Sequence, residues 1–155
     1  MSLRFEIPGA VPLEIADLVC DVNGTLTDRG RVLDGVRERI VALRERCAIH
    51  LVSADTFGTL ATLAADLGVD AVRISSGEDK RAFVEARGAG RCCGVLGNGR
   101  NDELALRAAA LGIVVLGPEG ASPRSLLAAD VVCASVTDAL DLLADPQALA
   151  ATIRP

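Results

Sequence analysis

The sequence predicts an α/β fold with a mainly parallel central sheet that is covered by helices on both faces. Six short segments are mainly apolar along both faces, which is typical of strands buried on both sides. Amphipathic segments of helical length separate them, and strands that alternate with helices in this way form parallel sheets. A chain of 155 residues is long enough for one such three-layer domain.

The start of the chain predicts a short N-terminal β-hairpin. Residues 5–15 form two alternating runs around a Pro-Gly turn, so the hairpin is expected within residues 1–16. It leads into the first strand of the sheet. The six sheet strands are expected at residues 18–22, 48–52, 71–74, 93–96, 113–116 and 131–133.

Amphipathic periodicity places helices between these strands. Their expected ranges are residues 34–46, 56–67, 79–87, 101–110, 122–128 and 137–143, followed by a C-terminal helix within residues 144–155. We therefore expect a single domain over residues 1–155, with its core in residues 17–143. The connections between its elements are too short to contain a separate lid domain.

Composition and charge argue against several classes of partner. The net charge is −5 and the only aromatic residues are three Phe, so the chain is poorly suited to bind phosphate backbones or to stack on bases. The most apolar later segment, residues 108–117, is far shorter than the roughly 20 residues of a membrane span. Five cysteines without a Cys-x-x-Cys pair are typical of buried thiols in a reducing compartment. We therefore expect a cytoplasmic protein that binds neither nucleic acid nor membranes.

Three polar clusters follow predicted strands at their carboxyl ends. The first strand leads into residues 21–25, Asp-Val-Asn-Gly-Thr, and the second leads into residues 53–55, Ser-Ala-Asp. The fourth leads into residues 97–102, Gly-Asn-Gly-Arg-Asn-Asp. Ligands of open parallel sheets bind beyond these strand ends. The sequence therefore predicts one binding site built from three separate parts of the chain.

The order of these clusters resembles the motifs of the haloacid dehalogenase (HAD) superfamily of phosphohydrolases. Residues 21–25 are similar to its Asp-x-Asp-Gly-Thr motif, Ser53 to the hydroxyl residue after its second strand, and Lys80 to its motif lysine. Residues 97–102 are similar to its Gly-Asp-Gly-x-Asn-Asp motif, in the form found in soluble P-type-ATPase-like proteins. The resemblance spans residues 17–143. It implies a Rossmann-like HAD fold without a cap domain, and a phosphatase or an ATPase-type hydrolase.

The residue types suit phosphoryl transfer, which needs an in-line nucleophile and neutralisation of charge. Asp21 is expected to be the nucleophile, because a carboxylate can form an aspartyl-phosphate; a strand-end cap is its alternative role. Lys80, the one lysine beside fifteen arginines, suits contact with both phosphate and carboxylate, although it could also be an exposed helix lysine. Ser53 could bind phosphoryl oxygens or cap a helix. His50 lies inside a strand and is expected to be structural.

The resemblance assigns further residues to the substrate and to a cofactor. The substrate-binding residues that it implies are Gly24, Thr25, Ser53, Ala54, Lys80 and Asn101. It also implies Mg²⁺ as the cofactor, and the expected metal-binding residues are Asp21, Asn23, Asn98 and Asp102. Asn23 would contribute its backbone carbonyl, and Asp102 also suits the N-terminal cap of a helix.

Two positions depart from the family pattern, because Asn23 and Asn98 stand where the family usually has aspartates. An amide at position 23 cannot shuttle a proton, and acid–base help of this kind contributes about 10²- to 10⁴-fold. An amide at position 98 should weaken a magnesium site, because Mg²⁺ prefers charged oxygen ligands. With Asp21, Asn23 and Lys80 as the catalytic set, we predict a slow phosphohydrolase that forms an aspartyl-phosphate.

Two other functions stay open from the sequence. The same two asparagines are compatible with a HAD-fold protein that has lost catalysis and works as a binding or regulatory module. A phosphatase of sugar or lipid phosphates, completed by an acidic side chain of a neighbouring subunit, is the second. The leading prediction takes a phosphorylated small molecule or a phosphoprotein as its substrate. An open site of this kind also favours a homo-oligomer.

Overall fold

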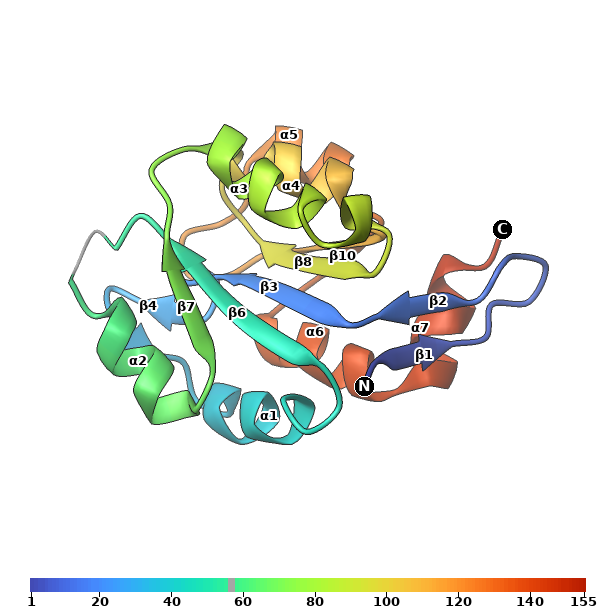
Figure 1. Cartoon of the computed structure of the whole chain (residues 1–155), viewed down its shortest axis with the longest axis horizontal. Helices are drawn as coiled ribbons and strands as arrows, with labels where there is room; N and C mark the ends of the chain where they lie inside the picture. Colours follow the sequence, from blue (N-terminus) through green and yellow to red (C-terminus); the bar gives the residue numbers. More distant parts are fainter. Residues whose placement is uncertain (56–57) are drawn as a thin grey trace.

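The computed structural model describes residues 1–55 and 58–155 and contains the predicted central sheet (Figure 1). Six strands lie in the order β10-β9-β8-β3-β6-β7, and every neighbouring pair is parallel. Their bounds are β3 Asp17–Asp21, β6 Ala48–Ser53, β7 Asp70–Arg73, β8 Cys93–Gly97, β9 Leu111–Val115 and β10 Val131–Cys133. Each strand begins and ends within one or two residues of its predicted position. The α/β prediction is confirmed.

Helices cover both faces of the sheet (Figure 1). One face carries α3 (Gly77–Glu85), α4 (Glu103–Ala108) and α5 (Pro123–Ala128). The other carries α1 (Val36–Leu43), α2 (Leu60–Leu67) and α6 (Val136–Ala144), and α7 (Pro146–Ile153) follows α6 beside the N-terminal strands. This arrangement is the three-layer architecture that the alternation of strands and helices predicts.

Local residues explain where several helices begin. Ser76 caps α3 by accepting a hydrogen bond from the backbone N–H of Asp79, so this helix begins two residues before its predicted position. The fourth predicted helix begins at Glu103, because residues 100–102 form a 3₁₀ turn instead. The expected start of the second helix, at residue 56, lies outside the described residues.

The predicted N-terminal hairpin is present and belongs to the core. Strands β1 (Leu3–Phe5) and β2 (Leu13–Ile15) pair antiparallel. Leu3, Phe5 and Ile15 are fully buried in the main hydrophobic cluster, and β1 lies beside α7. The hairpin therefore extends the packed interior beyond the end of the sheet.

A second hairpin follows the first polar cluster and was not predicted. Strands β4 (Thr27–Asp28) and β5 (Arg31–Val32) pair antiparallel across a turn at Arg29 and Gly30, which have φ values of 48° and 84°. Each strand has only two residues, so it is too short for an alternating pattern to be detected in the sequence.

The core explains why the inner residues of the central strands are apolar on both faces. Leu18 and Cys20 of β3 pack in one cluster with Leu140 of α6, whereas Val19 packs on the opposite face in a cluster with Leu106 of α4. Successive side chains of a strand point to opposite faces, so both faces must be apolar when helices cover both. Among the helices of residues 1–55 and 58–155, none combines the length and the hydropathy needed to cross a membrane.

Candidate active site

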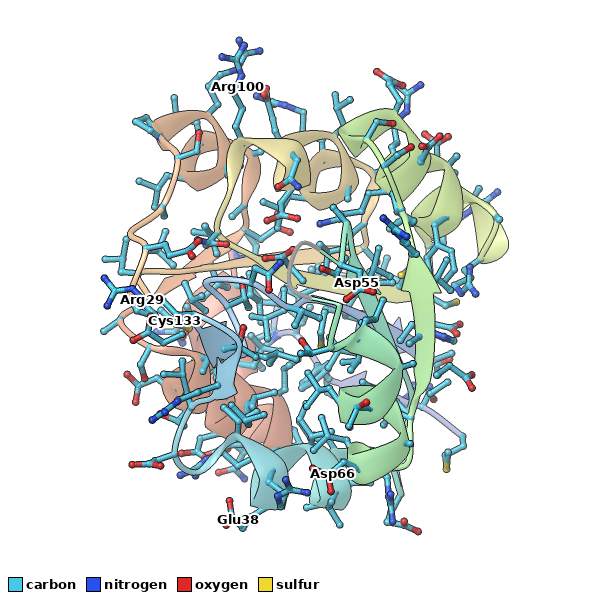
Figure 2. The ribbon with its side chains drawn as sticks, turned by 90° about the vertical axis from the view of Figure 1, so that its left-hand side faces the viewer. Arg29, Glu38, Asp55, Asp66, Arg100 and Cys133 are labelled. Carbon is cyan, nitrogen blue, oxygen red and sulfur yellow. The ribbon has the colours of Figure 1, made fainter. Side chains whose placement is uncertain are left out.

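The candidate site lies at the carboxyl end of the sheet, where Asp21 ends β3, Ser53 ends β6 and Asn98 follows β8. These strands are neighbours, with β3 in the middle. Figure 2 views the molecule from this side, with Asp55, two residues after Ser53, near the centre. A cavity of about 190 Å³ is lined by Asp21, Asn23, Ser53, Ala54, Asn98, Gly99, Asn101 and Glu119. The structure thus brings the three polar clusters together.

Lys80 forms ion pairs with two buried carboxylates, one of which lines this cavity. Its Nζ donates hydrogen bonds to Oδ1 of Asp21 at 3.1 Å and to Oδ1 of Asp102 at 2.5 Å. The lysine side chain is only 2% exposed. It reaches the site from α3, where Ser76 at the N-terminus of the helix fixes the start of the turn that contains it. The alternative of an exposed helix lysine is therefore wrong.

Asp102 fixes the loop after β8. Its Oδ2 accepts hydrogen bonds from the backbone N–H of Asn98 at 3.0 Å and of Gly99 at 2.9 Å. A Cβ atom on Gly97 would stand 2.5 Å from Cγ of Asp102, so glycine is required there for this close approach. Both carboxylate oxygens of Asp102 are therefore already engaged, one by Lys80 and one by the loop.

Thr25 connects the first and the last motif. Its Oγ1 lies 2.9 Å from Oδ2 of Asp21 and 3.1 Å from Oδ1 of Asn98, so the two oxygens share the one proton that this hydroxyl group can donate. The Thr25 side chain is fully buried. Two oxygens from different strands are thereby held around one hydroxyl group.

Burial and neighbouring charges shift the pKa values of Asp21 and Lys80, which lie in contact with Asp102. Burial, together with the neighbouring carboxylate of Asp102, raises the pKa of Asp21 to about 7, although Lys80 and Thr25 act to lower it. Burial alone would lower the pKa of Lys80, but Asp21 and Asp102 outweigh burial and raise it. Lys80 is therefore a permanent cation, while Asp21 changes its charge near neutral pH.

The remaining predicted residues surround the opening of the cavity. Asn23 Nδ2 makes a long contact of 3.5 Å with Oγ of Ser53, which also accepts a hydrogen bond from the backbone N–H of Asp55. Ala54 and Asn101 line the cavity beside them. Ser53 thus caps the turn after β6 while its hydroxyl group faces the site.

His50 lies at the other end of the sheet. Its Nε2 is 2.7 Å from Oδ1 of Asp17, the first residue of β3, and its ring meets the edge of Phe83 at 5.6 Å between centroids. Asp21 is at the opposite end of the same strand. His50 is therefore a structural residue, as the sequence predicted.

Glu119 is the residue of the cavity that sequence reasoning missed. It lies in the loop between β9 and α5, outside the resembling motifs. The signal that could have found it is positional, because β9 is the neighbour of β8 and its carboxyl end must open on the same edge of the sheet. The sequence Gly-Pro-Glu-Gly at residues 117–120 marks a turn at that strand end.

The oxygen donors near Asp21 determine whether Mg²⁺ could be held. Within residues 1–55 and 58–155, no three His, Cys, Asp or Glu side chains are grouped as a metal-binding set. Asp21 Oδ2 and Asn98 Oδ1 nevertheless lie around the single hydroxyl of Thr25. Mg²⁺ commonly keeps several waters and uses one or two carboxylates. A donor set of one carboxylate, one amide oxygen and water therefore fits this ion, with fewer charges than the family pattern provides.

Comparisons with known proteins give two short relatives by sequence. No family model matches the chain. An uncharacterized protein of Methanocaldococcus jannaschii, MJ0073, is 51% identical over 59 residues, which cover 38% of this chain and 63% of the relative. A second one, MJ0072, is 44% identical over 39 residues, which cover 25% of this chain and 89% of the relative. The chain thus spans less than two thirds of MJ0073, and neither relative has an assigned activity.

Solved structures give a much longer match. A candidate HAD family hydrolase of Streptomyces avermitilis superposes with a TM-score of 0.70 at 22% identity, covering 91% of this chain and 90% of its own. A 3-deoxy-D-manno-octulosonate 8-phosphate phosphatase of Moraxella catarrhalis, solved with magnesium, phosphate and KDO, has a TM-score of 0.65 at 17% identity, covering 90% and 94%. The catalytic domain of the CPx-ATPase CopB-B gives 0.63 at 22%, covering 74% and 46%. The chain therefore has the fold of the haloacid dehalogenase superfamily.

Proposed function

We propose that the chain is a magnesium-dependent phosphohydrolase in which Asp21 attacks phosphorus and forms an aspartyl-phosphate. The observation that carries the proposal is the contact of buried Lys80 with Asp102 and with Asp21, which lines a small cavity. A buried lysine in this position supplies the positive charge that a phosphoryl group needs, and it holds the nucleophile in place. The phosphatase of Moraxella catarrhalis, which has the same fold, binds magnesium and phosphate.

The side chains around the cavity divide the work of phosphoryl transfer. Asp21 provides the attacking oxygen, and Lys80 neutralises charge on the incoming group while Asp102 keeps the lysine in position. Ser53 offers a hydroxyl donor on the side of β6. Thr25 orients Asp21 Oδ2 through its hydrogen bond. Positioning and neutralisation of charge are the main requirements of this reaction, and Lys80, Asp102, Ser53 and Thr25 would provide them around Asp21.

Asp21 and Asn98 would hold the metal ion, together with the backbone carbonyl of Asn23. When bound, Mg²⁺ would neutralise charge on the phosphoryl oxygens. Asp102, the fourth expected metal-binding residue, also holds Lys80 and the loop after β8 through its hydrogen bonds. Gly24, Ala54 and Asn101 would shape the space for the substrate.

Turnover is expected to be slow. Asn23 provides an amide at the position that would protonate the leaving group and then activate water. Its contact with Ser53 is long, and an amide exchanges no proton near neutral pH.

We propose a phosphorylated small molecule or a phosphoprotein as the substrate. We also propose that the protein is soluble and forms a homo-oligomer.

A second candidate is a phosphate-binding regulatory protein without turnover. The raised pKa of Asp21 favours it, because a protonated carboxyl group is a poor nucleophile below about pH 7. Negative charge on a bound phosphoryl group would raise this pKa further, whereas a bound cation would lower it. If the effect of the cation prevails, Asp21 is ionised and can act as a nucleophile. If the effect of the phosphoryl group prevails, Asp21 stays protonated and the protein only binds phosphate.

The test is formation of the covalent intermediate. The protein is incubated with magnesium and acetyl phosphate, quenched in acid and analysed by intact and peptide mass spectrometry. Acetyl phosphate has a good leaving group, so it does not need the acid that Asn23 cannot provide. We expect a phosphoryl adduct on Asp21 that is absent from Asp21→Asn. An unmodified wild-type protein at high magnesium concentration would instead support the regulatory protein.

A further inference from the structure

Glu119 brings a second carboxylate to the cavity that contains Asp21. Its Cδ lies 2.8 Å from the point where a Cβ atom on Gly24 would stand, and Nδ2 of Asn98 lies 2.9 Å from the same point. Gly24 has a φ of +75°, a conformation that residues with a side chain rarely adopt. The carboxylate of Glu119 therefore occupies space above the first motif that the missing side chain of Gly24 leaves open.

The amide of Asn98 holds the loop that carries Glu119. Nδ2 of Asn98 donates to the backbone carbonyl of Gly120 at 3.0 Å, and the backbone carbonyl of Asn98 accepts from the N–H of Ser122 at 2.8 Å. These two bonds fix the loop at Gly120 and Ser122, directly after Glu119. An aspartate at position 98 would have no donor for the carbonyl of Gly120. The amide that departs from the family pattern therefore anchors a carboxylate from another loop.

Glu119 is the group of the cavity that is free to exchange a proton with water. The lining has two carboxylates, Asp21 and Glu119, and Asp21 is the nucleophile. The other hydrogen-bonding side chains of the lining are amides and the hydroxyl of Ser53. Glu119 is exposed to solvent, and within the described part of the chain its side chain makes no hydrogen bond or ion pair. A carboxylate of this kind can accept a proton and pass it to solvent.

We propose that Glu119 is the general base for hydrolysis of the aspartyl-phosphate; this rests on the proposed function of Asp21. The oxygen of a water molecule forms a bond to phosphorus, and the bond between phosphorus and the Asp21 oxygen breaks. The electron pair of that bond stays on the Asp21 carboxylate. The proton that the water loses moves to the carboxylate of Glu119, which then releases it to solvent. The products are inorganic phosphate and free Asp21.

The experiment compares how fast the adduct decays. Wild type, Glu119→Gln and Glu45→Gln are labelled with acetyl phosphate and magnesium and freed of reagent, and the adduct is followed by mass spectrometry after acid quenching. Glu45 is a matched control, because it is an exposed glutamate just before β6, at the opposite end of that strand from Ser53. We expect Glu119→Gln to form the adduct as wild type does but to lose it roughly 10²-fold more slowly. Added formate should accelerate the decay in Glu119→Ala, since it restores a carboxylate.

The other outcomes are decisive in different ways. Equal decay in wild type and Glu119→Gln would overturn the role of Glu119 and leave the proposed function intact. If decay is slow in Glu119→Gln and higher magnesium restores the wild-type rate, Glu119 binds the metal and does not accept the proton. That outcome would also overturn its role as general base. Loss of adduct formation in Glu119→Gln alone would do the same, because the role concerns only the second step. No adduct in wild type would contradict the proposed function itself.

Discussion

Lys80 donates a hydrogen bond to Asp102 across 2.5 Å, and the same Nζ is 3.1 Å from Asp21. Both carboxylates and the lysine are nearly inaccessible to solvent. Removing one member of such a group leaves an uncompensated charge in the interior, which costs more than an exposed ion pair contributes. The contact therefore serves stability and phosphoryl transfer together, so substitution of Lys80 should affect both.

The first prediction concerns Lys80→Met, which keeps an unbranched side chain one atom shorter and removes the charge. We expect the free energy of unfolding to fall by about 3–5 kcal/mol, because Asp21 and Asp102 lose their common cation. Urea unfolding followed by circular dichroism measures this change. Labelling of Asp21 by acetyl phosphate should be abolished in whatever fraction remains folded.

Arg81→Met is the matched control for that variant. Arg81 is the next residue of α3, its side chain is 43% exposed, and it pairs with Glu78 on the surface. A surface substitution of this kind changes stability by roughly 0.5 kcal/mol or less. Similar decreases in the free energy of unfolding of both variants would mean that the buried ion pairs of Lys80 stabilise the fold no more than a surface ion pair does.

The second prediction follows from the pKa of Asp21, which is raised from 3.8 to about 7, mainly by burial. Between these values the folded protein holds more protons than the unfolded chain, so the contribution of Asp21 to stability decreases as the pH rises. We expect the stability of wild type relative to Asp21→Asn to fall between pH 4 and pH 7. The slope is at most about 1.4 kcal/mol per pH unit for one group. Thermal or urea unfolding across this range measures it.

Asp34→Asn is the control for the pH series, because Asp34 is exposed. The stability difference for Asp21→Asn should depend on pH more steeply than the difference for this control. A flat difference for Asp21→Asn would show that Asp21 titrates in the folded protein as it does in the unfolded chain.

The third prediction concerns the N-terminal hairpin. Phe5→Ala should lower the free energy of unfolding by about 3–5 kcal/mol, because Phe5 is fully buried among core residues. Val11→Ala, in the connection between β1 and β2, removes side-chain atoms from a residue that is 84% exposed and should change little. Equal effects in the two variants would mean that the hairpin is an appendage and not part of the core.

The strand ends could be predicted from sequence, because parallel strands present their carboxyl ends at one edge. Asp21, Ser53 and Asn98 were therefore placed together correctly. The contacts of Lys80 depend on how α3 packs over β3 and β8, which no local pattern contains. Glu119 was not predicted, because a single glutamate in a turn forms no recognisable motif. Its loop follows β9, which is the neighbour of β8. Packing between distant segments, more than local structure, decided what was missed.

The fourth prediction concerns Asn98→Asp, which restores the carboxylate of the family pattern. We expect magnesium to bind more tightly in isothermal titration calorimetry, because a charged oxygen replaces an amide oxygen next to Asp21. Without magnesium the variant should be less stable by about 0.5–1.5 kcal/mol, since the hydrogen bond from the amide to the carbonyl of Gly120 is lost.

Asn101→Asp provides the control for that variant, because it adds the same charge to the lining of the same cavity. Its exposed side chain should leave the stability without magnesium nearly unchanged. If Asn98→Asp binds magnesium no better than Asn101→Asp, position 98 is not a metal ligand in this chain.

The fifth prediction concerns Asn23→Asp, which places an ionisable group beside Ser53 at the edge of the cavity. In a Glu119→Gln background, which removes the base proposed above, the new carboxylate should shorten the lifetime of the adduct by about 10²- to 10⁴-fold, because it can accept the proton of the attacking water. Adduct formation from acetyl phosphate should change little, because that step has a good leaving group. Quenched-flow labelling followed by mass spectrometry separates the two rates. An unchanged lifetime would mean that a step other than proton transfer at position 23 limits turnover, and the amide would then not explain slow hydrolysis.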